Sequence, residues 1–553
     1  MKIDEFYNEI DKSNFYLGMI SAVFRENSYV QVENLSLLNH RKLRLEQLIP
    51  NTINYFVVID SVQGLFIGEI YQAKVNSSDS VHDDLYMGNK ESIYPEIAID
   101  VIGILDGDKF KLAGFKTVGI TDKVYIANQK LVRKYLKSIE VNDYPIMDEN
   151  GKQKRDDDGK KMYQNALFNF AQLSNFESEF ISLKPNTLFD RHLMTIGTTN
   201  SGKSTSALSI LDKLVLSGKK VLIIDPTGEY KNAFNDTEAT KITLGKNAFL
   251  STGNVDDSFW INFFDVSSSE ESGKAAVLSD AISSLRYQNS IGDKSALVKD
   301  GAKASDLLFQ IDAVTSNRFD ISLLIEQIKN EAVKQVQESG IYKFKRDGNL
   351  YNASIWLIQK VSYFLKLSLI NDFFTMDDSK TNLFSELDSF ISSTNVKSLY
   401  IDSSTISKTN SAGQTIIDLI AQYILENKNS ADDSFVLFVD EVHRFIDKSS
   451  EDSALVTIAR EGRKKGIFLF LTTQNPKDVP DVLLGQVGTL IIHRLTHFEE
   501  LRAIQNQVQP NTLSQIRKLN QGEAILTSIN LLQDIHVRFE KSGRSHDNDT
   551  PLM

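Results

Sequence analysis

The stretch IGTTNSGKST, residues 196–205, decides the fold. Its Gly197, Gly202, Lys203 and Ser204 match G-x-x-x-x-G-K-[ST], the phosphate-binding loop of nucleotide-binding proteins. The apolar run HLMTI, residues 192–196, precedes the loop, and an amphipathic helical pattern follows it. Because the motif needs a strand before it and a helix after it, the sequence predicts a nucleotide site in an α/β fold.

The residues of this loop have distinct expected roles. Backbone N–H groups from Thr199 to Ser204 wrap the phosphates, and the positive end of the following helix assists them. Lys203 reaches the β- and γ-phosphates, and the Ser204 hydroxyl holds Mg²⁺. We therefore expect ATP and Mg²⁺ as cofactors, with ATP bound by Gly197, Thr199, Asn200, Ser201, Gly202, Lys203, Ser204 and Thr205.

An acidic pair ends a second apolar run, FVLFVDEVHRF, residues 435–445. Asp440 is expected to order the Mg²⁺ shell, because a carboxylate at the end of a buried strand has this role in P-loop proteins. Glu441 follows at once, where a carboxylate can polarise the attacking water. The alternative is an acidic pair that faces solvent.

Two further acidic residues, Asp225 and Glu229, lie in VLIIDPTGEY, residues 221–230. Asp225 and Glu229 follow a strand, and the carboxyl ends of strands form the ligand crevice of open α/β sheets. Glu229 is predicted to assist the water or the metal shell. The alternative is a capped turn shaped by Pro226 and Gly228.

Polar and basic groups flank the strand pattern GIFLFLTTQNP, residues 466–476. Gln474 is predicted to contact the γ-phosphate or the water, and the alternative is an amide satisfied by backbone. Just before this strand, AREGRKKGI contains Arg460 and Arg463, and Arg494 follows in IIHRLT. We expect at least one of these three arginines to reach the γ-phosphate of a neighbouring subunit, and a solvated helix end is the other interpretation.

The chain divides by pattern into several regions. Residues 1–135 carry short alternating runs that predict a small β-barrel, and 136–181 read as a linker with a charged hairpin. Strand–helix alternation over 182–266 and 395–540 predicts an α/β core with a mostly parallel sheet. Residues 267–394 are predicted to form a helical insertion, because segments such as SLLIEQIKNEAVKQVQES, residues 322–339, have helical apolar spacing. Residues 541–553 form a polar tail.

Composition excludes several classes of function. The 553 residues carry a net charge of 61 − 73 = −12, so any nucleic-acid contact needs a local basic patch. Absence of cysteine excludes disulfides, thiolate catalysis and cysteine-based zinc sites. The eight histidines show no metal-ligand spacing. The N-terminus lacks a secretory pattern and no run reaches 18 apolar residues, so we expect a cytoplasmic protein without a membrane contact.

Taken together, these motifs resemble those of the HerA family of hexameric DNA-translocating ATPases, relatives of FtsK. The resemblance is carried by HLMTIGTTNSGKST, VLIIDPTGEY, FVLFVDEVHRF, the segment from AREGRKKG to LIIHRL (residues 459–495) and LNQGEAIL (residues 519–526). It covers about 182 to 540, and the barrel before the core also fits the family's architecture. Two positions depart from the family pattern, since Thr227 replaces a usual His and Asn200 a usual Gly. Asn tolerates the left-handed backbone better than most residues.

The resemblance implies a RecA-like fold, a homohexameric ring and ATP hydrolysis at subunit interfaces. It also implies double-stranded DNA in the central channel and a nuclease or sirtuin-type effector as partner, with a role in DNA end processing or antiphage defence. Family roles carry over to Lys203, Ser204, Asp440, Glu441 and Arg463. We expect an ATP-dependent DNA translocase or helicase-like motor.

Two other functions remain open from the sequence. One is a type IV secretion or conjugation ATPase, which shares this core. The other is a nucleotide-gated hexameric scaffold that regulates an effector.

Overall fold

The structure is a computed structural model that describes residues 2–545 with short gaps. The gaps are 25–26, 44–45, 49–54, 77, 140–145, 147, 149–151, 156–158, 160, 163–166, 175–178, 268–270, 367–371, 378, 394–396, 407–409 and 447. The chain forms two compact units, Met1–Lys213 with Gly488–Ser542, and Leu214–Val487 with Gly543–Met553. We call them the first and the second unit. In the described chain no helix is both long and apolar enough to cross a membrane.

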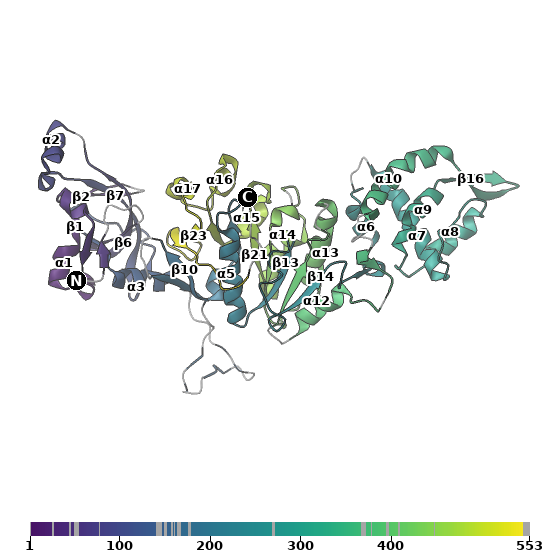
Figure 1. Cartoon of the computed structure of the whole chain (residues 1–553), viewed down its shortest axis with the longest axis horizontal. Coiled ribbons are helices and arrows are strands. Elements are labelled where there is room, and N and C mark those ends of the chain that lie inside the picture. The colour runs from purple at the N-terminus through teal and green to yellow at the C-terminus, as the bar shows by residue number, and fades with distance from the viewer. Residues whose placement is uncertain are drawn as a thin grey trace. The chain divides into compact units, whose positions relative to one another are not determined.

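The first unit begins with a closed antiparallel β-barrel (Figure 1). Its strand order is β2-β1-β9-β5-β6-β7, and β7 pairs back with β2 to close it. The strands are β1 (Tyr16–Val23), β2 (Ser28–Val32), β5 (Phe56–Ser61), β6 (Gly64–Lys74), β7 (Glu96–Asp106) and β9 (Lys123–Ile126). The interior is filled by apolar side chains such as Val57, Phe66 and Ile97. The predicted barrel is present.

Helix α3 (Gln129–Ile139) belongs with this barrel. Its Tyr135 is fully buried, and its ring packs 5.3 Å from that of Phe56 and 6.4 Å from that of Phe110 on β8 (Lys109–Lys111). The predicted boundary at 135 therefore falls inside a helix that the barrel holds in place.

A mixed sheet completes the first unit, in the order β11-β10-β24-β23-β22-β12. The strands are β10 (Leu167–Leu173), β11 (Phe180–Leu183), β12 (Leu193–Ile196), β22 (Thr489–Ile492), β23 (Glu523–Ser528) and β24 (Ile535–Arg538). β12 and β22 are parallel, and the other pairings are antiparallel. The region predicted as a linker, 136–181, thus contains a full strand of this sheet and the start of another. Its Asn150-Gly151 turn lies outside the described residues.

The second unit contains a parallel sheet in the order β21-β20-β13-β19-β14. The strands are β13 (Lys220–Asp225), β14 (Ala239–Thr243), β19 (Ser398–Asp402), β20 (Phe435–Val439) and β21 (Ile467–Thr473). Every residue of β13, β19 and β20 is buried, which is typical of a parallel sheet covered on both faces. Helices α12 (Leu383–Ser392), α13 (Asn410–Asn427) and α14 (Ala454–Glu461) belong to the same unit. The predicted parallel α/β core is confirmed.

The inserted region, predicted over 267–394, is mostly helical but begins earlier, at α6 (Asp257–Phe263), and it also contains a hairpin and the short strand β18 (Phe374–Thr375). Its helices are α6, α7 (Ser272–Ser290), α8 (Ala304–Asp312), α9 (Leu324–Asn330) and α10 (Gly348–Lys366). The stretch predicted as one helix over 322–339 is wrong in its second half, because α9 ends at Asn330 and β16 (Val333–Glu338) pairs with β17 (Ile341–Arg346). Ser339 and Gly340 have φ of 51° and 83°, which turns the chain into a hairpin instead of continuing the helix.

Candidate nucleotide-binding site

The predicted phosphate loop connects β12 to α5 (Lys203–Leu216), as the motif requires. At Gly197 an added Cβ atom would lie 2.5 Å from Ser201 Oγ and 2.7 Å from the Cβ of His493. Gly202 has φ of 111°, and a Cβ there would lie 2.9 Å from the Gly522 backbone. Both glycines are therefore required by space, and Gly202 also by its left-handed backbone conformation.

Hydrogen bonds hold the loop at both of its ends. The Thr198 N–H and hydroxyl both donate to the Arg494 carbonyl, at 3.2 and 3.1 Å. The Gly522 N–H donates to the Ser201 carbonyl at 3.0 Å. Asn200 has φ of 61°, so the residue that replaces the family's usual glycine does adopt a left-handed backbone.

Beneath the loop lies His493, which sequence reasoning missed. It directly follows β22, is fully buried, and places Nε2 2.8 Å from the Ser206 hydroxyl and Nδ1 2.8 Å from the Glu523 carbonyl. Burial, together with the charge of nearby Lys203, lowers the pKa of His493 to about 4. The ring is therefore neutral at pH 7, donates from Nδ1 to the carbonyl and accepts from Ser206 at Nε2.

The predicted acidic pair follows β20 and is buried, with Asp440 and Glu441 each 4% exposed. This excludes the alternative of a pair that faces solvent. The Thr472 hydroxyl donates to Asp440 Oδ1 at 2.5 Å, and the Glu441 N–H donates to the same hydroxyl oxygen at 2.9 Å. One threonine at the end of β21 thus orients both acids.

Glu441 is the residue around which the predicted catalytic groups gather. The Gln474 amide donates to Glu441 Oε1 at 2.5 Å, and His443 Nδ1 lies 3.3 Å from Oε2. Glu441 has φ of 47° and ψ of 51°, a left-handed conformation that is unfavourable for a residue with a side chain. Strain of this kind costs on the order of 1–3 kcal/mol and persists where the surroundings enforce it, commonly at functional sites.

Asp225 has a structural role that the sequence left open. Its Oδ1 accepts from the N–H groups of Thr227 and Gly228, at 2.9 and 2.8 Å, and from the Thr227 hydroxyl. Its Oδ2 accepts from the Tyr230 N–H and the Tyr400 hydroxyl. Asp225 therefore caps the turn in which Glu229 stands half-buried.

The three candidate arginines are all exposed. Arg460 lies in the last turn of α14 and Arg463 in the short 3-10 helix that follows, Gly462–Lys465. Arg494 differs from both, because its carbonyl binds the phosphate loop of its own chain through Thr198.

The donor set predicted for Mg²⁺ fits that ion. The Ser204 hydroxyl and the Asp440 carboxylate are hard oxygen ligands, which Mg²⁺ prefers, and it commonly keeps several waters. Within the described part of the chain no cluster of three or more His, Cys, Asp or Glu forms a separate metal site.

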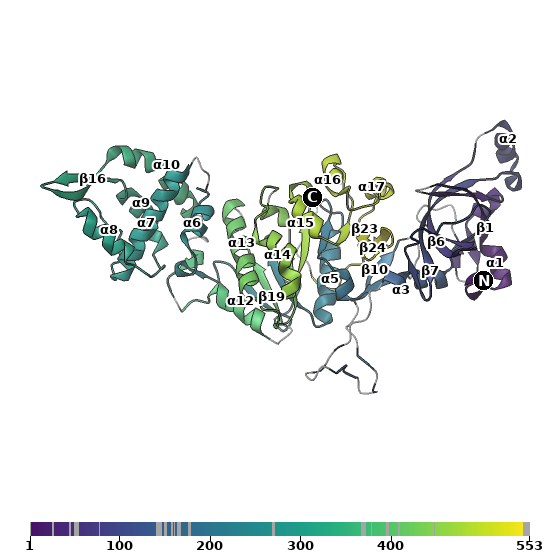
Figure 2. The same cartoon turned by 180° about the vertical axis from the view of Figure 1, so that it is seen from behind.

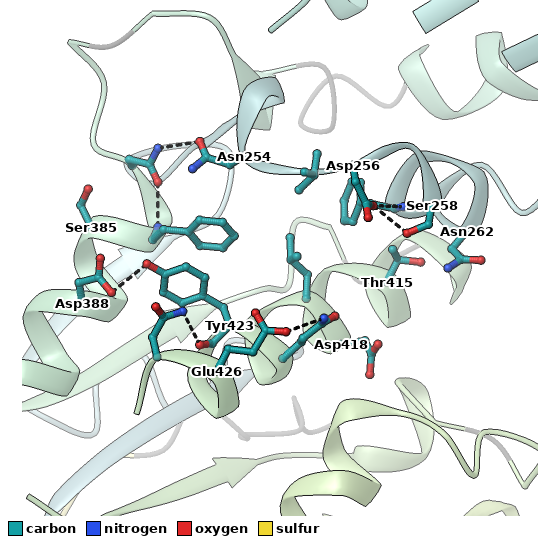
Figure 3. Close-up of a pocket in the computed structure, with 17 residues that line it drawn as sticks. Asn254, Asp256, Ser258, Asn262, Ser385, Asp388, Thr415, Asp418, Tyr423 and Glu426 are labelled. Carbon is teal, nitrogen blue, oxygen red and sulfur yellow. Dashed lines mark hydrogen bonds between the residues drawn. The ribbon is translucent and has the colours of Figure 1, made fainter. Parts of the chain in front are cut away.

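A cavity of about 600 Å³ in the second unit is a different site (Figure 3). It is lined by the carboxylates of Asp256, Asp388, Asp418 and Glu426 and by the stacked rings of Phe384 and Tyr423. Burial, and then the hydrogen bond to Asp388, raises the pKa of Tyr423 to about 12. None of the described residues that line the cavity is a lysine or arginine, so it does not suit a nucleotide phosphate.

Comparisons with known proteins place these motifs in a family. A probable helicase of Methanocaldococcus jannaschii is 22% identical over 87% of this chain and 92% of its own length. The probable DNA double-strand break repair helicase HerA of the same organism is 22% identical over 68% of this chain and 76% of its own. Among solved structures, the bacterial conjugative coupling protein TrwB has a TM-score of 0.45 at 16% identity, over 67% of this chain and 90% of its own.

Two family models match consecutive parts of the chain. The model described as the central domain of helicase HerA matches residues 169–430, and the HerA-like C-terminal model matches residues 420–532. The first match begins within β10, in agreement with a core that starts before the predicted 182. The two matches contain the phosphate loop, the acidic pair, Gln474 and His493, and the chain belongs to the HerA family of helicase-like P-loop ATPases.

Proposed function

We propose that this protein is an ATP-dependent DNA translocase that works as a helicase-like motor. The observation that carries the proposal is Glu441, a buried carboxylate held in a strained backbone and contacted by both Gln474 and His443. A scaffold that only binds nucleotide has no need of such a group. Family membership and relatives named as helicases support the same activity.

In this proposal each of the predicted site residues has a distinct role in ATP hydrolysis. Lys203 binds the β- and γ-phosphates, and Ser204 and Asp440 hold the Mg²⁺ that neutralises their charge. Glu441 accepts a proton from the attacking water. Gln474, which is bonded to Glu441, orients that water, and Glu229 assists from the Asp225 turn.

The same proposal includes a homohexamer around double-stranded DNA. Arg463 is assigned to the neighbouring subunit's γ-phosphate because the family pattern places the arginine there, and its exposed side chain is compatible with contact to a second copy. Arg494 is the weaker candidate, since its backbone is tied to its own phosphate loop. The N-terminal barrel is assigned to an effector, a nuclease or a sirtuin-type protein, in DNA end processing or antiphage defence. A motor on such DNA works in the cytoplasm.

The decisive experiment compares ATP hydrolysis with and without duplex DNA for the wild type and for Glu441→Gln. We expect DNA to stimulate the wild type, and the variant to bind ATP but hydrolyse it about 10²–10⁴-fold more slowly. Asp478→Asn, a change at a carboxylate in the following segment, is the matched control and should hydrolyse ATP normally. Hydrolysis that DNA does not alter would contradict the motor, and normal turnover by Glu441→Gln would move the base elsewhere.

A further inference from the structure

The hairpin β16–β17 carries a concentration of positive charge in an otherwise acidic chain. Its residues 333–346 include four basic side chains and one acidic side chain, whereas the whole chain has a net charge of −12. Figure 1 shows the hairpin standing out from the helices of the insertion, and the reverse view in Figure 2 agrees. The sequence analysis did not predict this hairpin, because it assigned residues 322–339 to one helix.

Strand register places three lysines of the hairpin on one face. Lys334 pairs with Lys345, and Val336 pairs with Lys343, so Lys334, Lys343 and Lys345 share a face. We call these three residues the lysine face. Their side chains are 59%, 42% and 52% exposed. Like charges directly opposite each other destabilise a strand pair, so the hairpin's own stability does not account for this arrangement.

The opposite face and the base of the hairpin are fixed to the insertion. Phe344 is buried, its N–H donates to the Ala302 carbonyl at 2.9 Å, and its carbonyl accepts from the Gly301 N–H at 2.8 Å. Next to this segment, Lys299 and Glu331 form a buried ion pair at 2.5 Å. Isolated two-stranded hairpins are marginally stable, so this anchoring is what holds the lysine face out in a fixed orientation.

The carboxylates near the lysine face neutralise it only partly. Glu338 lies near both Lys343 and Lys345, and Asp347 lies 2.9 Å from Lys334. Three lysines therefore share two carboxylates in ion pairs, and Asp300 adds a weaker electrostatic attraction on Lys345. Exposed ion pairs of this kind contribute little to stability, so a polyanion can displace them.

We propose that the lysine face binds the backbone phosphates of duplex DNA, an inference that rests on the proposed function. A two-stranded ribbon fits the major groove of B-DNA, which is about 12 Å wide. Each lysine that neutralises a phosphate releases a counterion, and this release favours binding without regard to base sequence. Such a contact suits a motor that must hold DNA of any sequence.

The test measures the affinity of the full chain for a short fluorescein-labelled DNA duplex over a series of salt concentrations. The lysine-face variant is Lys334→Gln, Lys343→Gln and Lys345→Gln. Its matched control changes three other exposed lysines of the insertion, Lys294, Lys329 and Lys366, to Gln. Both triple variants alter the net charge equally, and neither touches the nucleotide motifs.

For the lysine-face variant, the slope of log K against log salt should fall by about 0.9 per lysine. Binding should weaken by roughly 10²- to 10³-fold at about 0.1 M salt. The control variant should keep a slope near that of the wild type. Glu338→Gln should act in the opposite direction, because it frees two lysines. We expect roughly tenfold tighter binding at that salt, a gain that misfolding cannot produce.

The outcomes separate this inference from the proposed function. If the wild type binds duplex DNA but both triple variants give the same slope of log K against log salt, the role of the lysine face is overturned and the proposed function is not. A wild type that binds no duplex overturns the motor and the lysine face together. Stronger competition by RNA than by duplex DNA, lost in the lysine-face variant, would assign the face to RNA and also overturn the inference.

Discussion

Protonation of His493 should release the phosphate loop, and His493→Gln is the variant that isolates this effect. In the folded chain the neutral ring accepts a hydrogen bond from Ser206 and packs against Gly197. The pKa of His493 is lowered from 6.5 to about 4, mainly by burial. The unfolded chain therefore takes up a proton between these two values that the folded chain does not.

The magnitude follows from this difference of pKa. One pKa unit corresponds to about 1.4 kcal/mol, so the neutral ring contributes about 3 kcal/mol of stability above pH 6.5. Because the folded pKa is depressed, the contribution is lost as pH falls, by about 1 kcal/mol at pH 5.5 and by about 2–3 kcal/mol at pH 4.5. A rise of pH above 7 should change nothing at this residue.

Hydrogen exchange of the segment 193–210 measures this local stability, which suits a chain of more than one unit that need not unfold in a single step. After correction for intrinsic exchange, the advantage of the wild type over His493→Gln should shrink between pH 7 and pH 4.5. His82→Gln, at an exposed histidine of α2 (Asp79–Met87), should follow the wild type. A wild-type advantage that is constant across this range would refute the reasoning.

Three other predictions concern the motor. Lys203→Ala should weaken ATP binding and turnover because it removes the charge on the β- and γ-phosphates, and equilibrium binding of a fluorescent ATP analogue at wild-type strength would contradict this role. Arg463→Ala should keep ATP binding but lose most hydrolysis, since arginines of this kind contribute about 10³–10⁵ in rate. Mixing it with Lys203→Ala protein should restore part of the activity, and the absence of recovery despite subunit exchange would exclude action across an interface. Deletion of residues 1–139, which removes the barrel and α3, should abolish binding of the effector that co-purifies with the native protein, whereas ATP binding should persist. Effector binding that survives the deletion would place the docking surface elsewhere.

Local motifs were readable from the sequence because each is contained within one strand, loop and helix. The phosphate loop, the buried acidic pair and Gln474 all lie in continuous stretches whose apolar flanks predict buried strands. Asn200 was also correctly interpreted, since its left-handed backbone follows from the position it occupies. The barrel was predictable from the spacing of its short runs.

Features that depend on contacts between distant residues were not readable. His493 is 287 residues from Ser206, and only the pairing of β22 with β12 brings the two together. The part that Asp225 plays in its turn was left open, and the N–H groups and the tyrosine hydroxyl that bond to its carboxylate show that it caps the turn. The hairpin was mistaken for helix because Val333 and Val336 also fit helical spacing, and the turn at Ser339-Gly340 overrides that pattern.

The pairing of β12 with β22 makes the nucleotide site sensitive to insertions and deletions far from the motif in sequence. Ile196 lies opposite Ile492, so Gly197 and His493 leave the sheet side by side. A one-residue shift of β22 reverses which face each of its side chains occupies, and it would carry the imidazole away from the loop. Deletion scanning should therefore find residues 489–493 as intolerant of length change as the glycine-rich loop itself, whereas the exposed tip at Ser339-Gly340 should accept added residues.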